Sequence, residues 1–271
     1  GINSAMKIYI SADMEGITGV THWNEVDPEK PDYAQFQKRM TEEVVSACRG
    51  ALDAGAEKIM VKDAHYTGRN ILPADLPEEA ELIRGWSGHP YSMVQELDGT
   101  FDALMMVGFH SRAGSGGNPL SHTWSSGKIE RMFINGKEAS EFLLHGYIGA
   151  KHGVPIAFVS GDKELCREVN EVSAGTATFV TMEGVGDSTI SIHPEKALKS
   201  IRKTVCDALK SVDKISAWPL PDEFELSIRY VKQTAAYRAS QYPGAESVSP
   251  KTVRYKAKDY DDIMRFFLFC V

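Results

Sequence analysis

The hydrophobic and polar positions of the chain alternate between short apolar runs and longer amphipathic segments. In residues 33–54 the apolar side chains recur at helical spacing along one stripe, and Gly55 supplies a stop for this helix. Residues 102–109 are apolar almost throughout, which is typical of a strand buried on both faces. This alternation predicts an α/β fold with a mostly parallel sheet and flanking helices. Further strands are expected just before Asp13 and at residues 58–62, 81–83, 129–134 and 155–160, and a further helix at residues 138–151.

The last third of the chain differs from the rest in its order of elements. We expect two domains: a metal-binding α/β core at residues 6–192 and a smaller C-terminal α+β domain or cap at residues 193–271. Residues 1–5 look like a cloning remnant ahead of a natural start at Met6. The C-terminal elements are expected to be a helix at residues 195–212, an alternating strand at 225–231 and an amphipathic helix at 260–269.

Composition narrows the classes of function. With 271 residues, 42% of them hydrophobic and 25% charged, the chain can bury a substantial core. Its net charge of −7 and the lack of a basic run argue against a nucleic-acid partner. No apolar stretch approaches the roughly 20 residues that span a bilayer, so no membrane partner is expected. Four scattered cysteines predict reduced thiols in a cytoplasmic protein: Cys48, Cys166, Cys206 and Cys270.

Side chains of the kind that bind metal ions follow three of the expected strands. Asp13 and Glu15 come directly after the first strand, and His65 and His110 each follow a later one. Because the carboxyl ends of parallel strands meet at one edge, where open α/β folds bind their ligands, we expect these side chains to lie together. Glu141 joins them if its helix begins at the same edge. Carboxylates combined with imidazoles suit zinc, manganese or iron.

Each of these residues also has a purely structural interpretation. Asp13 and Glu15 can cap a turn, and a lone His65 or His110 is more often a hydrogen-bonded edge residue than a ligand. Three separate strand ends with ligand-type side chains favour the metal site. Three carboxylates and two histidines exceed the needs of one tetrahedral zinc ion, so we expect two ions with one bridging carboxylate. Asp63 is expected to orient the His65 imidazole.

A stretch rich in glycine and serine, residues 111–127, predicts a long loop over the same edge. His122 lies late in this loop, where it is a candidate for acid–base catalysis or for stabilising an oxyanion. A solvent-exposed loop histidine is the alternative. His145 lies four residues after Glu141 on the same helix face, and its role stays open. The remaining histidines are expected to have no catalytic role: His22, His89, His152 and His193.

Taken together, these motifs resemble the zinc-dependent D-aminopeptidase family. The resemblance extends in order over roughly the first 165 residues and more faintly to the C-terminus. It implies two zinc ions per subunit, with the family's metal-ligand positions at Asp13, Glu15, His65, His110 and Glu141 and its catalytic histidine at His122. The residues that carry it are Ser11-Ala12-Asp13-Met14-Glu15-Gly16, Asp63-Ala64-His65, Gly108-Phe109-His110-Ser111-Arg112, Ser121-His122 and Ile134-Asn135-Gly136 with Glu141.

The resemblance also implies an activity and an assembly. The activity is hydrolysis of short peptides with N-terminal D-amino acids by a metal-activated water, and the assembly is a homo-oligomer such as a decameric ring. One departure concerns the segment around residues 180–187. Relatives are expected to carry a lysine near Thr181 and an arginine near Gly186, and neither basic residue is present. This departure leaves the exact substrate open.

Two other functions are alternatives. A dinuclear hydrolase of another bond, such as an N-acetyl or phosphoester bond, uses the same kind of metal ligands. Phosphoester chemistry usually needs a nearby arginine or lysine, and Arg112 is the obvious loop candidate. The second alternative is a metal-binding homologue that has lost its activity.

Overall fold

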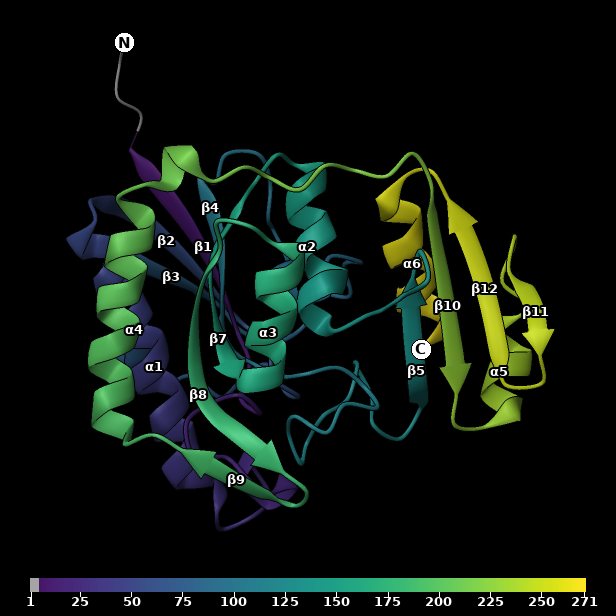
Figure 1. The fold of residues 1–271 in the computed structure, drawn as a ribbon, viewed down its shortest axis with the longest axis horizontal. Helices are drawn as coiled ribbons and strands as arrows, with labels where there is room; N and C mark the ends of the chain where they lie inside the picture. The colour runs from purple at the N-terminus through teal and green to yellow at the C-terminus, as the bar shows by residue number, and fades with distance from the viewer. Residues whose placement is uncertain (1–4) are drawn as a thin grey trace.

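The computed structural model describes residues 5–271, which form two β-sheets with helices packed around them (Figure 1). The expected cloning remnant at residues 1–5 lies outside the described residues except for Ala5. The larger sheet has seven strands and the smaller sheet has five. The larger sheet positions the candidate metal ligands, because three of its strands end beside them.

The larger sheet is parallel except at one edge. Its strands are β1 (Met6–Ala12), β2 (Ala56–Asp63), β3 (Ala80–Ile83), β4 (Ala103–Phe109), β7 (Ile156–Asp162), β8 (Ala177–Val185) and β9 (Ser188–Ser191). They lie in the order β3-β2-β1-β4-β7-β8-β9, and only β9 runs antiparallel to its neighbour. The chain extends outward from β1 in one direction and from β4 in the other. The carboxyl ends of β1 and β4 therefore form a topological switch point, the usual ligand site of such sheets.

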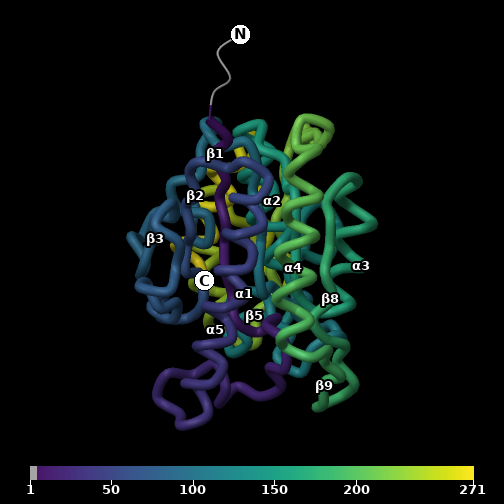
Figure 2. Tube along the Cα trace, turned by 90° about the vertical axis from the view of Figure 1, so that its left-hand side faces the viewer, coloured from purple at the N-terminus to yellow at the C-terminus, as the bar shows by residue number. Residues whose placement is uncertain are grey.

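Helices cover both faces of the larger sheet (Figures 1 and 2). Helices α1 (Tyr33–Asp53) and α4 (Pro194–Leu209) lie on one face, and α2 (Glu141–Lys151) and α3 (Lys163–Val172) lie on the other. Strand β1 is buried on both sides: Ile8 and Ile10 pack with α1 and α4, whereas Tyr9 belongs to the core shared with α2. This double burial explains why Ile8, Tyr9 and Ile10 follow one another without a polar residue. The expected fold class, a mostly parallel sheet with flanking helices, is confirmed.

The smaller sheet is antiparallel and lies beyond α2 (Figure 1). Its order is β11-β12-β10-β5-β6, and α6 packs between it and α2, where the Tyr260 hydroxyl donates a hydrogen bond to the carbonyl of Leu144. Its strands are β5 (Ile129–Ile134), β6 (Lys137–Glu138), β10 (Phe224–Tyr230), β11 (Glu246–Ser249) and β12 (Thr252–Ala257), and its helices are α5 (Gln233–Ala239) and α6 (Tyr260–Cys270).

Two helix boundaries differ from the prediction by more than one residue. The helix expected at residues 138–151 begins only at Glu141, because Glu138 pairs with β5 and the Ser140 hydroxyl caps the helix by accepting from Leu143 N at 3.1 Å. The helix expected at residues 195–212 ends at Leu209. Between β5 and β6, Asn135 and Gly136 both have positive φ angles (50° and 78°), as a type I′ turn requires.

The division of the chain at residue 193 stays a prediction. Two features of the structure bear on it: β5 pairs with β10 from the C-terminal part, and α4 packs on α1, where Arg202 Nε donates to Asp53 Oδ2 at 2.7 Å. Within residues 5–271 no helix combines the length and apolar character needed to cross a bilayer. Short 3-10 helices complete the fold: η1 (Trp23–Val26), η2 (Pro73–Asp75), η3 (Ser92–Val94) and η4 (Val212–Lys214).

Candidate metal centre

The five expected metal ligands converge at the switch point of the larger sheet. Asp13 and Glu15 follow β1, His65 follows β2, and His110 follows β4. Glu141 is the first residue of α2, so its carboxylate also stabilises a helix N-terminus. All five side chains are buried, with 4% or less of each residue exposed.

Two glycines allow the chain to bring Asp13 and His110 together. Gly16 N donates to the carbonyl of Gly108 at 2.9 Å, which fixes the turn after β1 against the end of β4. A Cβ atom on Gly16 would lie 1.8 Å from the carbonyl oxygen of Phe109, so no larger residue fits there. Gly108 has a φ of +69°, a conformation that glycine adopts at little cost.

The first group of ligand atoms surrounds His65. Its Nδ1 lies 3.1 Å from Asp13 Oδ1 and 3.2 Å from Glu15 Oε1. Its Nε2 lies 2.7 Å from the carbonyl of Val26, which can only accept a hydrogen bond. Nε2 therefore carries the proton, and the Nδ1 lone pair of the neutral imidazole faces the two carboxylates.

The second group of ligand atoms surrounds His110. Here Nδ1 faces a backbone carbonyl and Nε2 faces the carboxylates, the reverse of the arrangement at His65. His110 Nδ1 lies 3.0 Å from the carbonyl of Ser111, and Nε2 lies 3.3 Å from both Asp13 Oδ2 and Glu141 Oε1. Asp13 is thus shared, one oxygen facing each histidine. Within each of the sets Asp13–Glu15–His65 and Asp13–His110–Glu141, the ligand atoms lie within 4.8 Å of one another.

This arrangement of donor atoms fits divalent cations. Lone pairs of neutral histidines that face carboxylates repel them unless a proton or a cation lies between them. Two buried atoms at the centre, His110 Nε2 and Glu15 Oε2, have no hydrogen-bond partner among the described residues. Histidine ligands whose other nitrogen is fixed by a backbone carbonyl are typical of metal sites. The site therefore has the charge, the ligand types and the unpaired atoms that two zinc ions need.

The pKa directions express the same demand for positive charge. Burial disfavours a charged imidazole, yet for His65 the carboxylates of Glu15 and Asp13 outweigh it and raise the pKa well above its usual value. The pKa of His110 rises likewise through Glu141 and Asp13. For Glu141, burial is outweighed by the charge and the hydrogen bond of His110, and its pKa is lowered to about 2. When no cation is bound, His65 and His110 therefore take up protons, which supply the positive charge that the carboxylates favour.

His122 is buried beside the two ligand groups, not exposed as the alternative interpretation required. Its ring stacks on His110 with a centroid separation of 4.1 Å. Nδ1 lies 2.7 Å from the carbonyl of Leu120, and Nε2 faces Glu141 Oε2 at 3.5 Å and Glu15 Oε1 at 3.8 Å. Burial, with the nearby His110, lowers the pKa of His122, so the ring is neutral and Nε2 is free to accept a proton.

The loop that carries His122 is tied to the centre at several points. Asn118 Nδ2 donates to the carbonyl of Glu15 at 3.0 Å, and Trp124 N donates to Glu141 Oε2 at 2.7 Å. Trp124 adopts a positive φ of 67°, which is uncommon for a bulky residue. His145 lies behind this loop: its Nδ1 faces the carbonyl of Glu141 at 2.7 Å and its ring stacks near Trp124, outside both ligand groups.

The partner of His65 was not found from the sequence. Asp63 was expected to orient the imidazole, and this prediction is wrong. The Asp63 carboxylate instead accepts hydrogen bonds from Asn70 N at 2.6 Å and Ile71 N at 2.7 Å, which shape the following loop. The carbonyl of Val26 orients His65, and a backbone atom 39 residues away leaves no signal in the residue pattern.

Thr181 and Gly186, where basic residues were expected, contribute to the backbone framework. The Thr181 hydroxyl is buried and donates to the carbonyl of Gly16 at 2.6 Å, so it braces the turn between Glu15 and the sheet. Gly186 lies in the β8–β9 turn with a φ of +57°. The other histidines have structural contacts: His22 and His193 cap helices, His89 accepts from Tyr91 N, and His152 pairs with the Tyr91 hydroxyl.

A cavity of about 340 Å³ opens onto the centre. Glu15, His65 and His122 form part of its wall, and Trp23 and Tyr66 stand partly exposed at its side. No lysine or arginine of residues 5–271 lines it. A second cavity of about 290 Å³ adjoins the same ligands and is bounded by Trp86 and Trp124. The ligand-atom groups are therefore reachable from solvent through an aromatic-walled opening.

Comparisons with known proteins agree with this architecture. A family model described as D-aminopeptidase matches residues 6–269. A D-aminopeptidase of Bacillus subtilis (strain 168) is 32% identical over 256 residues, which cover 94% of this chain and 92% of that protein. The solved structure of the Zn-dependent D-aminopeptidase DppA from Bacillus subtilis, described as a self-compartmentalizing protease, superposes with a TM-score of 0.91 at 30% identity. That match covers 97% of this chain and 96% of the other. This chain belongs to the D-aminopeptidase family.

Proposed function

We propose that this chain is a zinc-dependent aminopeptidase that hydrolyses short peptides with an N-terminal D-amino acid. The observation that carries the proposal is the pair of buried ligand groups that share Asp13, in a chain of the D-aminopeptidase family. A Zn-dependent relative with the same fold supports the choice of metal.

In this proposal Asp13, Glu15 and His65 would hold one zinc ion, and Asp13, His110 and Glu141 would hold a second. Zinc, when bound in such a site, supplies Lewis acidity and lowers the pKa of water toward neutrality. The protein contributes ligands that are already oriented by backbone carbonyls and buried away from competing water.

His122 is proposed as the general acid–base. Its proton on Nδ1 is held by Leu120, and its neutral Nε2 can take a proton from the attacking water and return it to the leaving amine. The cavity wall includes Asp27, a carboxylate that is not among the proposed zinc ligands, and its charge favours a substrate with a free, positively charged amino terminus. That preference accounts for exopeptidase action.

A matched set of substrates tests the proposal. Zinc-reconstituted protein should cleave D-Ala-Gly-Gly and leave L-Ala-Gly-Gly and N-acetyl-D-Ala-Gly-Gly intact. Chelation should abolish turnover, and zinc should restore it. The exposed substitution Asp207→Asn serves as a control, because among residues 5–271 the Asp207 side chain pairs only with Lys203 on the surface. Equal cleavage of the D- and L-peptides would contradict the stereochemical part, and activity that survives chelation would contradict the metal.

The alternative function, hydrolysis of phosphoesters, needs a basic residue to bind the phosphate, and Arg112 is not free for this role. Arg112 Nη1 lies 2.6 Å from Glu138 Oε2, so its charge is already paired. The competing idea of an inactive homologue is tested by the same peptide set, since any chelator-sensitive turnover excludes it.

We also infer that the protein is a cytoplasmic homo-oligomer. The self-compartmentalizing relative supports assembly, and so do the aromatic side chains exposed beside the cavity, Trp23 and Tyr66 (40% and 68%). The four cysteines are all free, which suits a reducing compartment. Light scattering after gel filtration tests the oligomer: a decamer of 29.9 kDa chains would have a mass of 10 × 29.9, or about 299 kDa. A monomer at micromolar concentration would contradict the inference.

A further inference from the structure

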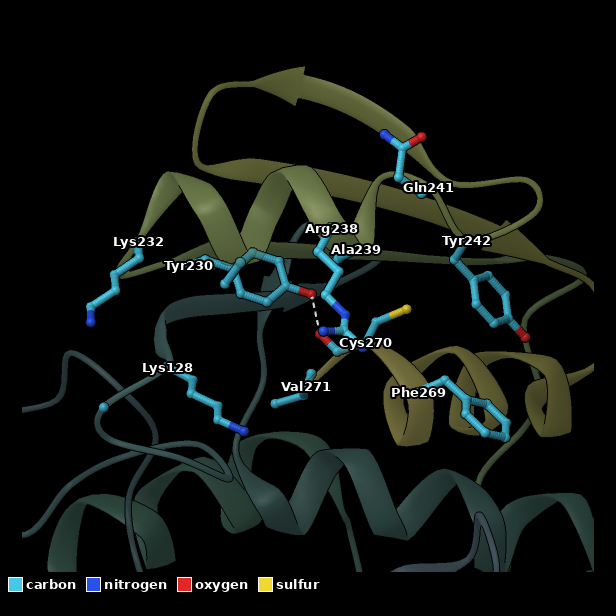
Figure 3. A pocket seen from close by; sticks show the side chains of 12 residues that line it. Lys128, Tyr230, Lys232, Arg238, Ala239, Gln241, Tyr242, Phe269, Cys270 and Val271 are labelled. Atoms are coloured by element: carbon cyan, nitrogen blue, oxygen red, sulfur yellow. Dashed lines mark hydrogen bonds between the residues drawn. The ribbon is translucent and has the colours of Figure 1, made fainter.

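A cavity of about 750 Å³ lies in the C-terminal part of the chain, between α5, the end of α6 and the segment before β5 (Figure 3). None of the candidate metal ligands lines it. Its volume is in the range of pockets that hold small organic molecules. Tyr230, Tyr242 and Phe269 contribute aromatic surface to it, and Phe269 is 69% exposed.

The charged side chains of this cavity all have the same sign. Lys128, Lys232 and Arg238 line it, and no aspartate or glutamate side chain of residues 5–271 does. Figure 3 shows Arg238 and Lys128 extending toward the Cys270–Val271 end of the chain from opposite sides. Neither forms an ion pair with a described aspartate or glutamate. On the neighbouring smaller sheet, by contrast, Arg229 pairs with Glu130 at 2.9 Å and Arg254 pairs with Glu246 at 2.6 Å.

The framework of the cavity is fixed by hydrogen bonds. The Tyr230 hydroxyl donates to the carbonyl of Cys270 at 2.8 Å, which ties β10 to the end of α6 (Figure 3). Val231 N donates to the carbonyl of Lys128 at 2.9 Å, which holds the backbone of that lysine. Burial raises the pKa of the Cys270 thiol to about 11, so the cavity has no thiolate nucleophile at neutral pH. Its residues are suited to binding and not to chemistry.

We propose that this cavity binds an organic anion with an apolar body, its carboxylate or phosphate held by Arg238 and Lys128 and its apolar part packed on Tyr242 and Phe269. A guanidinium group matches the geometry of carboxylate and phosphate oxygens and forms charge-assisted hydrogen bonds to them. The end of the main chain at Val271 adds at most one negative charge to the three positive side chains, so the cavity keeps a net positive charge. In a chain whose net charge is −7, such a cavity is an attractive place for an anion.

Calorimetric titration of the zinc-containing protein tests the proposal with three probes. N-acetylphenylalanine and phenyl phosphate represent the two sources of negative charge, and N-acetylphenylalanine amide is the neutral control. We expect at least one of the two anions to bind, the amide not to bind, and the affinity to fall as salt is added. The anion that binds more tightly identifies the source.

Two substitutions locate the binding. Arg238→Gln should weaken it by at least about tenfold, because a charge-assisted hydrogen bond is lost. Arg265→Gln changes the net charge equally at an exposed position on α6 and should leave affinity unchanged. Because Arg238 is exposed and its side chain has no intramolecular hydrogen bond among the described residues, the fold should persist, which circular dichroism checks. The proposal would be overturned if neither anion binds or if the neutral amide binds as well as the anions. It would also be overturned if Arg238→Gln binds the anions with undiminished affinity, as expected for anions held at the zinc centre.

Discussion

Glu43 provides a stability test that is separate from metal binding. It is 2% exposed on α1, where Oε2 accepts a hydrogen bond from Thr18 N at 3.0 Å and Oε1 has no partner among the described residues. Burial raises the pKa of this carboxyl from 4.5 to about 7, although the contact with Thr18 opposes the rise. At neutral and higher pH the folded chain therefore holds a carboxylate that burial disfavours.

The sign and size of the effect follow from proton linkage. Between the unfolded and folded pKa values, 4.5 and about 7, the folded chain binds a proton at Glu43 that the unfolded chain has lost. The contribution of Glu43 to the free energy of unfolding is thus fully present below this window and falls as the pH rises through it. A difference of 7 − 4.5 at 1.36 kcal/mol per unit gives a loss of about 3 kcal/mol.

The substitution Glu43→Gln should remove this loss. Glutamine keeps an oxygen for Thr18 N, and its amide can donate to Thr18 Oγ1, which is buried without a described partner. Relative to the unsubstituted protein, the free energy of unfolding of the variant should rise by about 3 kcal/mol from about pH 4 to about pH 8. Urea unfolding at both pH values, with constant zinc, measures it. Burial also raises the pKa of Glu168 to about 7, but Glu168 is present in both proteins and its effect cancels.

The neighbouring Glu42 supplies the control. It is partly exposed and pairs with Arg39 at 3.1 Å, so Glu42→Gln should change stability by less than about 1 kcal/mol at either pH. If the difference between Glu43→Gln and the unsubstituted protein stays constant from about pH 4 to about pH 8, the reasoning about burial at Glu43 is refuted.

Three further predictions concern the candidate centre. His122→Ala should lower kcat by roughly 10²–10⁴-fold and leave zinc content unchanged, as measured by steady-state kinetics and metal analysis, because His122 moves a proton and is not proposed as a ligand; loss of zinc would assign it a ligand role instead. Gly16→Ala should destabilise the fold and lower the zinc content, because its Cβ would meet the Phe109 carbonyl. Gly116→Ala has open space around its Cβ and should leave the thermal unfolding temperature unchanged. Equal effects of the two substitutions would contradict the close approach at Gly16. Because no lysine or arginine of residues 5–271 lines the cavity beside the centre, D-Ala-D-Phe amide should show a higher kcat/KM than D-Ala-D-Phe, and the reverse order would reveal a carboxylate-binding group.

The positions of the candidate ligands were predictable because a parallel sheet gathers its strand ends at one edge. The apolar runs before Asp13, His65 and His110 identified three strands, and their order in the sheet placed these ends beside one another. Glu141 was predictable only as a candidate, since its position depends on where α2 begins, and Ser140 determines that start by capping the helix.

Other features depend on contacts between distant parts of the chain. The carbonyl of Val26 orients His65, but every residue type carries a carbonyl, so the sequence contains no sign of it. In the smaller sheet β5 pairs with β10, which lies nearly a hundred residues later in the chain. The periodicity of the sequence predicts each strand but does not say which strand it pairs with. The burial of His122 likewise results from loop contacts to Glu15 and Glu141 that no local pattern encodes.

The zinc content of the purified protein tests the central claim most directly. Metal analysis should find about two zinc ions per chain, as expected for a dinuclear hydrolase. Asp13→Asn should lose both, because Asp13 belongs to both ligand groups, whereas the surface control Asp207→Asn should retain both. Protein that binds no zinc after reconstitution, or Asp13→Asn protein with undiminished zinc, would contradict the assignment of this site as a dinuclear centre.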